Sequence, residues 1–129
     1  MAATRPEQII ELFVASFNAG DLEGLTSLYE SGAAIIPEPG QDPLSGVSAI
    51  SEFFKGFLAM KGRLTVLASS AVQCGDIALT HSSWRLDAPG AEPMEGATAE
   101  VSRRQPDGTW LYVIDNPWGA GVLAAATAR

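Results

Sequence analysis

Residues 6–29 read PEQIIELFVASFNAGDLEGLTSLY, and this stretch decides the fold that we expect. In its first half, apolar residues recur at helical spacing and form one stripe: Ile9, Ile10, Phe13, Val14 and Phe17. Gly20 suits the left-handed residue that follows a helix, and Asp21 suits the cap of a second helix. The stretch therefore predicts two amphipathic helices that cover a sheet.

The first helix is preceded by Thr4-Arg5-Pro6-Glu7, which has the pattern of a capping box. We expect the Thr4 hydroxyl to accept a hydrogen bond from the Glu7 amide, while the Glu7 side chain reaches back to the cap.

The remainder of the chain predicts one more helix and an antiparallel meander. A short strand over 32–36 and a proline-rich loop precede the helix, which follows Gly46 and closes at Lys61-Gly62. From Leu64 the apolar period becomes two, and Leu64, Val66, Val72 and Cys74 share one parity. Gly75-Asp76 predicts a hairpin, and further strands are expected over 77–87, 94–105 and 109–116. This order is typical of an α+β fold with the helices on one sheet face.

The composition limits the classes of function. The 129 residues include 8 basic and 15 acidic ones, for a net charge of −7, which argues against a nucleic-acid partner. One cysteine, Cys74, and one histidine leave no set of metal ligands with suitable spacing, and no phosphate-binding glycine loop is present, so we expect neither a metal nor a cofactor. No segment has the length or hydropathy of a membrane span, and we expect a cytoplasmic protein.

Three segments carry a resemblance to a known superfamily. FVASFNAGDLEGLTSLYE, SGVSAISEFFKGFL and VIDNPWG resemble the helix junction, third helix and final strand of nuclear transport factor 2-like proteins, within which the chain looks most like the SnoaL-like and ketosteroid-isomerase-like groups. The resemblance implies one domain over 1–129, with a core of about 6–119 and a tail over 119–129. It implies a cone-shaped barrel of N-terminal helices packed against a curved, mostly antiparallel sheet, enclosing a pocket.

The resemblance also implies what the chain lacks. The oxyanion-binding tyrosine of ketosteroid isomerase corresponds to Phe13, and its aspartate base corresponds to Pro37 in strict register, with Glu38-Pro39 one residue away. Its protonated aspartate corresponds to Glu100. We therefore do not expect steroid isomerase activity.

The same comparison implies which strand residues face the pocket. It places His81, Ser83 and Arg85 inward, together with Glu100, Ser102 and Asp115, and it places Trp84 on an outer face that forms a homodimer. This set predicts acid/base catalysis by His81, Glu100 and Asp115. The predicted ligand pocket adds ten residues: Phe13, Phe17, Tyr29, Glu38, Phe54, Phe57, Ser83, Arg85, Ser102 and Trp118.

Other interpretations stay open. His81 can be a structural residue, Arg85 can form a buried ion pair with Glu100 or Asp115, and Glu38 can be a solvated loop acid. Arg85, Asp87 and Asp115 also resemble the Asp-Arg-Asp arrangement of limonene-type epoxide hydrolases. The sequence thus favours an acid/base enzyme (isomerase, cyclase or dehydratase) for a small apolar molecule, with a non-catalytic binding or dimerisation module as the alternative.

Overall fold

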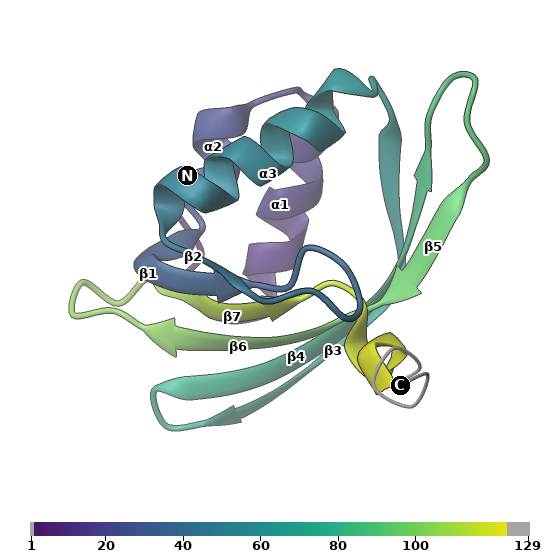
Figure 1. Ribbon diagram of the computed structural model, residues 1–129. Helices are drawn as coiled ribbons and strands as arrows, with labels where there is room; N and C mark the ends of the chain where they lie inside the picture. The colour runs from purple at the N-terminus through teal and green to yellow at the C-terminus, as the bar shows by residue number, and fades with distance from the viewer. Residues whose placement is uncertain (1, 124–129) are drawn as a thin grey trace.

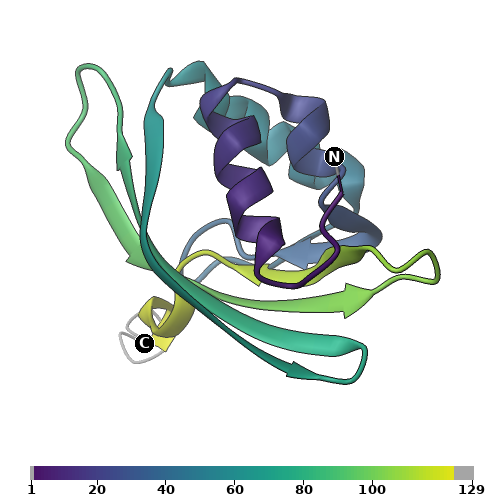
Figure 2. The ribbon, with the colours of Figure 1, turned by 180° about the vertical axis from the view of Figure 1, so that it is seen from behind.

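The computed structural model describes residues 2–123 and confirms the α+β class. Three helices lie together over one face of a strongly curved sheet (Figures 1 and 2). The helices are α1 Gln8–Asn18, α2 Leu22–Thr26 and α3 Val47–Ala59. The strands are β1 Tyr29–Ile35, β2 Leu44–Ser45, β3 Arg63–Cys74, β4 Ile77–Asp87, β5 Met94–Ala97, β6 Ala99–Arg104 and β7 Trp110–Asn116.

The sheet has the order β2-β1-β7-β6-β4-β3, with β5 beside the second half of β4. Within residues 2–123, β1 and β7 pair in parallel and all other strand pairs are antiparallel. The single strand expected over 94–105 is broken at Thr98 into β5 and β6. A 3-10 turn, Gly119–Gly121, opens the tail, and residues 124–129 of the tail lie outside the described residues.

The helix caps match the sequence pattern except at the first one. Asp21 caps α2 by accepting a hydrogen bond from the Gly24 amide at 2.9 Å, and Gly20 has the expected positive φ of 70°. The capping box of Thr4 and Glu7 is wrong, because α1 begins at Gln8, three residues after the start that a Thr4 cap implies. Both the amide and the hydroxyl of Thr4 donate instead to the side-chain oxygen of Gln8, at 2.8 and 3.0 Å.

At the end of α3, one residue takes the left-handed conformation and the next one leaves room for close packing. Lys61, not Gly62, takes the left-handed conformation, with φ of 55°. Gly62 is required for space: a Cβ there would lie 2.9 Å from Leu86 and 3.0 Å from the Asp87 carbonyl oxygen. The chain thus passes close to β4 as it leaves the helix.

A β-bulge changes the face of β3 halfway along. Val66 pairs with Trp84, but the next pair is Ala68 with Ser83, so Leu67 is the extra residue. Because one inserted residue reverses the alternation, Leu64 and Val66 face the helices, while Val72 and Cys74 face outward and are exposed. The single parity expected for these four residues is therefore wrong.

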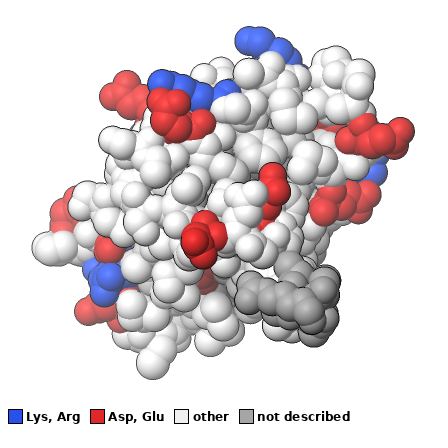
Figure 3. All heavy atoms as spheres, viewed as in Figure 1, with Lys and Arg blue, Asp and Glu red and all other residues white. Residues whose placement is uncertain are grey.

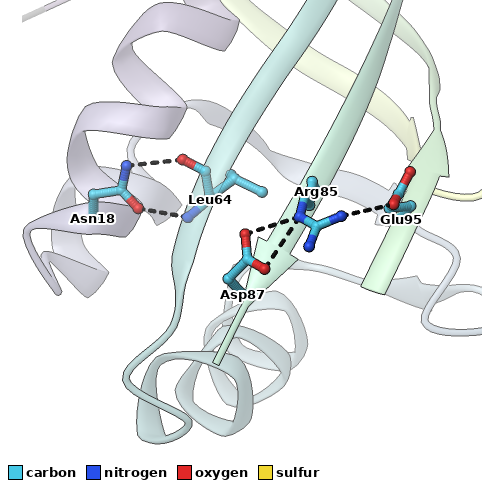
Figure 4. Close-up of polar contacts among 5 residues, drawn as sticks. All are labelled: Asn18, Leu64, Arg85, Asp87 and Glu95. Atoms are coloured by element: carbon cyan, nitrogen blue, oxygen red, sulfur yellow. Dashed lines mark hydrogen bonds and ion pairs between the residues drawn. The ribbon is translucent and has the colours of Figure 1, made fainter. Parts of the chain in front are cut away.

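Asn18 fastens the end of α1 to the edge strand β3. Its side-chain nitrogen donates to the Leu64 carbonyl at 3.0 Å, and its oxygen accepts from the Leu64 amide at 2.8 Å (Figure 4). An edge strand exposes unpaired backbone groups, and this amide satisfies one donor and one acceptor at once. It therefore holds α1 at a fixed position above the sheet.

We expect Asn18→Ala to lower the free energy of unfolding by about 1–3 kcal/mol, because two half-buried backbone groups lose their partners. Urea denaturation measures this, with Glu11→Ala on the exposed face of α1 as a control that should stay within about 0.5 kcal/mol of the parent. Equal stability of the two variants would contradict the fastening role.

Candidate functional site

A cavity of about 80 Å³ lies between α1, α3 and the sheet, and it is lined mainly by aromatic rings. All five Phe, two of the three Trp and one of the two Tyr contribute, which is eight of the ten aromatic residues of the chain. They are Phe13, Phe17, Phe53, Phe54, Phe57, Trp84, Tyr112 and Trp118. This concentration makes the cavity the first candidate for a ligand site.

The helix side of the cavity is a set of phenylalanines in mutual edge contact. Phe13 of α1 meets Phe54 of α3 at a centroid distance of 5.5 Å, and Phe53 meets Phe57 at 5.0 Å. Interplanar angles of 70° and 61° are the edge-to-face geometry that aromatic quadrupoles favour. The rings therefore form an ordered wall.

The opposite wall consists of Trp84 and Trp118, whose rings are in edge-to-face contact with a centroid distance of 5.7 Å. Each indole N–H is satisfied by backbone carbonyls: Trp84 donates to Pro117 at 2.8 Å, and Trp118 donates to Pro37 at 3.1 Å. Gly96 leaves room for this packing, since a Cβ there would lie 2.8 Å from the Trp84 ring. The proline-rich loop is thereby tied to the cavity wall.

Two buried carboxyls, Glu100 and Asp115, lie on the floor of the cavity. They are direct cross-strand partners on β6 and β7, so their side chains share the inner face. The Tyr29 hydroxyl donates to Asp115 at 2.5 Å, and the Thr80 hydroxyl donates to Glu100 at 2.8 Å. Each carboxyl thus has one fixed hydroxyl donor.

Burial raises the pKa of both carboxyls. The pKa of Glu100 rises from 4.5 to about 8, through burial and the charge on Asp115, and the Thr80 and Thr98 hydroxyls oppose this rise. The pKa of Asp115 rises from 3.8 to about 6 through burial, and the Tyr29 hydroxyl opposes this rise. The two carboxyls therefore titrate as a pair, which at neutral pH holds one proton and one negative charge.

Two further hollows adjoin the cavity. A smaller one, of about 60 Å³, lies under the start of α1 and reaches Glu100 and Thr80. An open groove between the proline-rich loop, α3 and β5 shares Phe53, Phe57 and Trp118 with the cavity, so it forms the mouth.

The predicted inward face of β4 is wrong. Ala78, Thr80, Ser82, Trp84 and Leu86 are buried, and the residues between them face outward. The reason is register: Thr80 pairs directly with Glu100, and cross-strand partners share a face. His81 is consequently exposed and lies outside the aromatic cavity, although it lines the rim of the smaller hollow under α1. Ser83 faces outward as well, and Trp84 belongs to the cavity and not to the outer surface.

Arg85 also lies outside the cavity. Its guanidinium pairs with Asp87 at 3.0 Å and with Glu95 at 3.0 Å on the outside of the β4–β5 arm (Figure 4). Asp115 is buried on the opposite face of the sheet, so Arg85, Asp87 and Asp115 do not form the epoxide-hydrolase arrangement. A buried ion pair of Arg85 with Glu100 or Asp115 is excluded for the same reason.

The remaining predicted residues divide into three groups. Phe13, Phe17, Phe54, Phe57 and Trp118 line the cavity with Glu100 and Asp115. Tyr29 does not line the cavity but donates a hydrogen bond to Asp115, and Glu38 is exposed at the rim of the mouth. Ser102 is fully buried, and its hydroxyl is the one buried side-chain oxygen without a hydrogen-bond partner among the described residues.

Sequence reasoning missed several residues of the site. Thr80, Ser82 and Trp84 were assigned to the outer face or passed over, and Tyr112 and Thr98 were not considered. Ser82 and Thr98 exchange hydrogen bonds where β5 and β6 separate. The available signal was the pair of hydroxyl residues at alternate positions, Thr80 and Ser82. Their parity is the one that faces the cavity, because Thr80 pairs with Glu100.

No group of three or more His, Cys, Asp or Glu side chains within residues 2–123 is placed to hold a metal ion. Across the same residues, none of the helices combines the length and the hydropathy needed to span a bilayer.

The raised pKa of Glu100 predicts a pH dependence of stability. Its folded-state pKa exceeds the ordinary 4.5, so the folded protein binds more protons, and this contribution is lost as pH rises from about 4.5 through 8. We expect the free energy of unfolding to fall over that interval, and to fall less in Glu100→Gln, by about 1.4 kcal/mol per pKa unit removed. Chemical denaturation at pH 5 and pH 8 measures it. The exposed Glu95→Gln should keep the parental fall, and equal pH profiles for both variants would refute the assignment.

Known proteins share this fold. A candidate calcium/calmodulin-dependent protein kinase type II association domain from Thiobacillus denitrificans superposes with a TM-score of 0.74 at 23% identity, covering 91% of this chain and 98% of its own. A candidate ketosteroid isomerase from Shewanella frigidimarina has a TM-score of 0.74 at 16% identity, covering 84% and 90%. A candidate dehydratase of the nuclear transport factor 2-like family from Streptomyces avermitilis has a TM-score of 0.71 at 19% identity, covering 85% and 89%. At these identities the likeness establishes the fold.

The family follows from the sequence itself. The profile of the SnoaL-like domain matches residues 10–116, which include most of α1, the carboxyl pair and the whole sheet. This chain belongs to the SnoaL-like domain family.

Proposed function

We propose that the protein is an acid/base enzyme, of isomerase or dehydratase type, for a small and largely apolar molecule. The observation that carries the proposal is the buried pair of Glu100 and Asp115 at the floor of an aromatic cavity. Solved relatives with the same fold are named as an isomerase and a dehydratase, which supports this reaction class for the chain.

The two carboxyls suit different halves of a proton transfer. Glu100, with a pKa of about 8, carries the proton at neutral pH and can donate it to an oxygen or carbon of the substrate. Asp115, with a pKa of about 6, is ionised and can remove a proton nearby. Because they lie side by side on adjacent strands, donation and removal act on the same face of the bound molecule.

One hydroxyl group supports this division of roles and another opposes it. Tyr29 donates to Asp115 and stabilises its charge, whereas Thr80 donates to Glu100 and lowers its pKa against the larger effect of burial. The Tyr112 ring lines the cavity beside both carboxyls. Burial raises the pKa of both tyrosines well above the ordinary 10, so they stay neutral donors. The aromatic walls exclude water, which strengthens the fields of these groups.

Deuterium incorporation from D₂O tests this activity. Small apolar ketones, incubated with the protein in D₂O, should exchange the hydrogens next to the carbonyl, as measured by NMR. Asp115→Asn removes the base, so the rate should fall by about 10²–10⁴-fold, which is the usual contribution of a positioned acid or base. Glu100→Gln should fall by a similar factor.

Asp87→Asn and Glu95→Gln are the matched controls, because both side chains lie on the outer face. Exchange that is equal in all four variants, or absent with every ketone that shifts the thermal unfolding midpoint, would favour the non-catalytic binding module instead.

A second property, self-association, is favoured by the outer face of the sheet. A continuous row of apolar side chains crosses four strands in register: Val72, Leu79, Val101 and Ile114. Val72, Leu79 and Ile114 are 68%, 43% and 47% exposed. Such contiguous apolar surface marks an interaction site. One solved relative is named an association domain, and we propose that a second copy of this chain covers the row, without Trp84.

Leu79→Glu should therefore convert the protein to a monomer, because a charge at the centre of the row would be buried without a partner. Sedimentation velocity measures the mass. Ala15→Glu adds the same charge on the exposed face of α1 and should leave the mass unchanged. A parent protein that sediments as a monomer at all concentrations would remove this proposal.

A further inference from the structure

The walls of the cavity present ring faces and edges to one small volume. Phe13, Phe54 and Phe57 come from the helices, and Trp84, Tyr112 and Trp118 come from the sheet side. An aromatic ring face attracts a cation within about 6 Å, and the attraction increases when both are removed from water. Several rings around one volume form the kind of cage that recognises organic ammonium ions.

The charge in the cavity has one sign only. Among residues 2–123, those that line the cavity and its mouth include Glu100, Asp115 and Glu38 and no lysine, arginine or histidine. On the face seen in Figure 3, acidic atoms lie both near the middle and at the periphery, while the basic atoms lie toward the periphery. A carboxylate or phosphate ligand would find no counter-charge here.

The buried negative charge creates a requirement that an apolar ligand does not meet. A charge in a hydrocarbon environment is costly unless it is paired, and sealing the cavity with a neutral molecule would leave Asp115 with the Tyr29 hydroxyl alone. A ligand of charge +1 would make the occupied cavity neutral, while Glu100 kept its proton.

We infer that the molecule bound in this cavity carries a positively charged nitrogen, as a small hydrophobic amine or quaternary ammonium ion held among the aromatic rings above Glu100 and Asp115. The inference rests on the proposed function, because it names the substrate class of that same site.

The groups that face Asp115 define the pH dependence. Tyr29 approaches from β1, Glu100 from β6 and Tyr112 from its own strand, while α1 and α3 present hydrocarbon and rings. Both tyrosines have raised pKa values and stay neutral. Cation binding should therefore follow the ionisation of the carboxyl pair and weaken as pH falls below about 6.

The test compares two probes of the same shape and different charge. Choline and 3,3-dimethylbutan-1-ol differ by a quaternary nitrogen in place of a quaternary carbon. We expect calorimetric titration at pH 7.5 to give at least tenfold tighter binding of choline, which is about 1.4 kcal/mol. At pH 5 the affinity for choline should fall several-fold, and that for the alcohol should not change.

Asp115→Asn should abolish the preference for choline, whereas Asp87→Asn on the outer face should keep it. Equal or tighter binding of the alcohol to the parent protein would overturn the inference and leave an apolar-binding acid/base enzyme. Failure of both probes to bind at saturating concentration would also overturn it, and the deuterium assay would then judge the proposed function separately. A preference for choline that survives Asp115→Asn and Glu100→Gln together would refute the role of the pair.

Discussion

The alignment of Thr80 with Glu100, and of Glu100 with Asp115, is the constraint on which the site depends. These three residues lie on three adjacent strands, β4, β6 and β7. Because side chains alternate strictly along a strand, one such alignment assigns every residue of β4 to the helix side or to the outer side. It places Trp84 in the cavity and His81 outside. The chemistry of the cavity is therefore that of two carboxyls and hydroxyls, without an imidazole.

The carboxyl pair and the aromatic walls act on each other. Eight aromatic residues surround the cavity above the two carboxyls, and burial of these carboxyls is the first cause of the raised pKa of Glu100 and Asp115. The same burial makes the charge on Asp115 costly, and only the Tyr29 hydroxyl, at 2.5 Å, offsets it within the described residues. The protein thus gives up some stability to keep one proton and one charge close together.

The sequence was sufficient to predict the architecture, because that architecture depends on local patterns. The apolar stripes of α1 and α3, the cap at Asp21 and the turn at Gly75-Asp76 each involve residues near in the chain. The positions of Glu100 and Asp115 on the inner face followed from the family resemblance. The face of β4 was not predictable in the same way. Ile77 and Leu79 are as apolar as core residues, yet they are 41% and 43% exposed, so the first half of β4 pointed to the wrong face. The second half held the correcting signal, because Trp84 and Leu86 share a parity that has no ionisable residue.

The bulge at Leu67 shows what decides between the two faces. It reverses the alternation of β3 so that Leu64 and Val66 pack inward beside Leu86 and Trp84, while Val72 joins Leu79 on the outside. Apolar residues of one parity are thereby divided between the cavity wall and the outer row. The inserted residue becomes evident only in the pairing of β3 with β4, because the spacing of apolar residues in β3 alone does not mark it. The cavity and the outer apolar row therefore arise from the same irregularity: a regular β3 would direct Val72 inward and remove one end of the row.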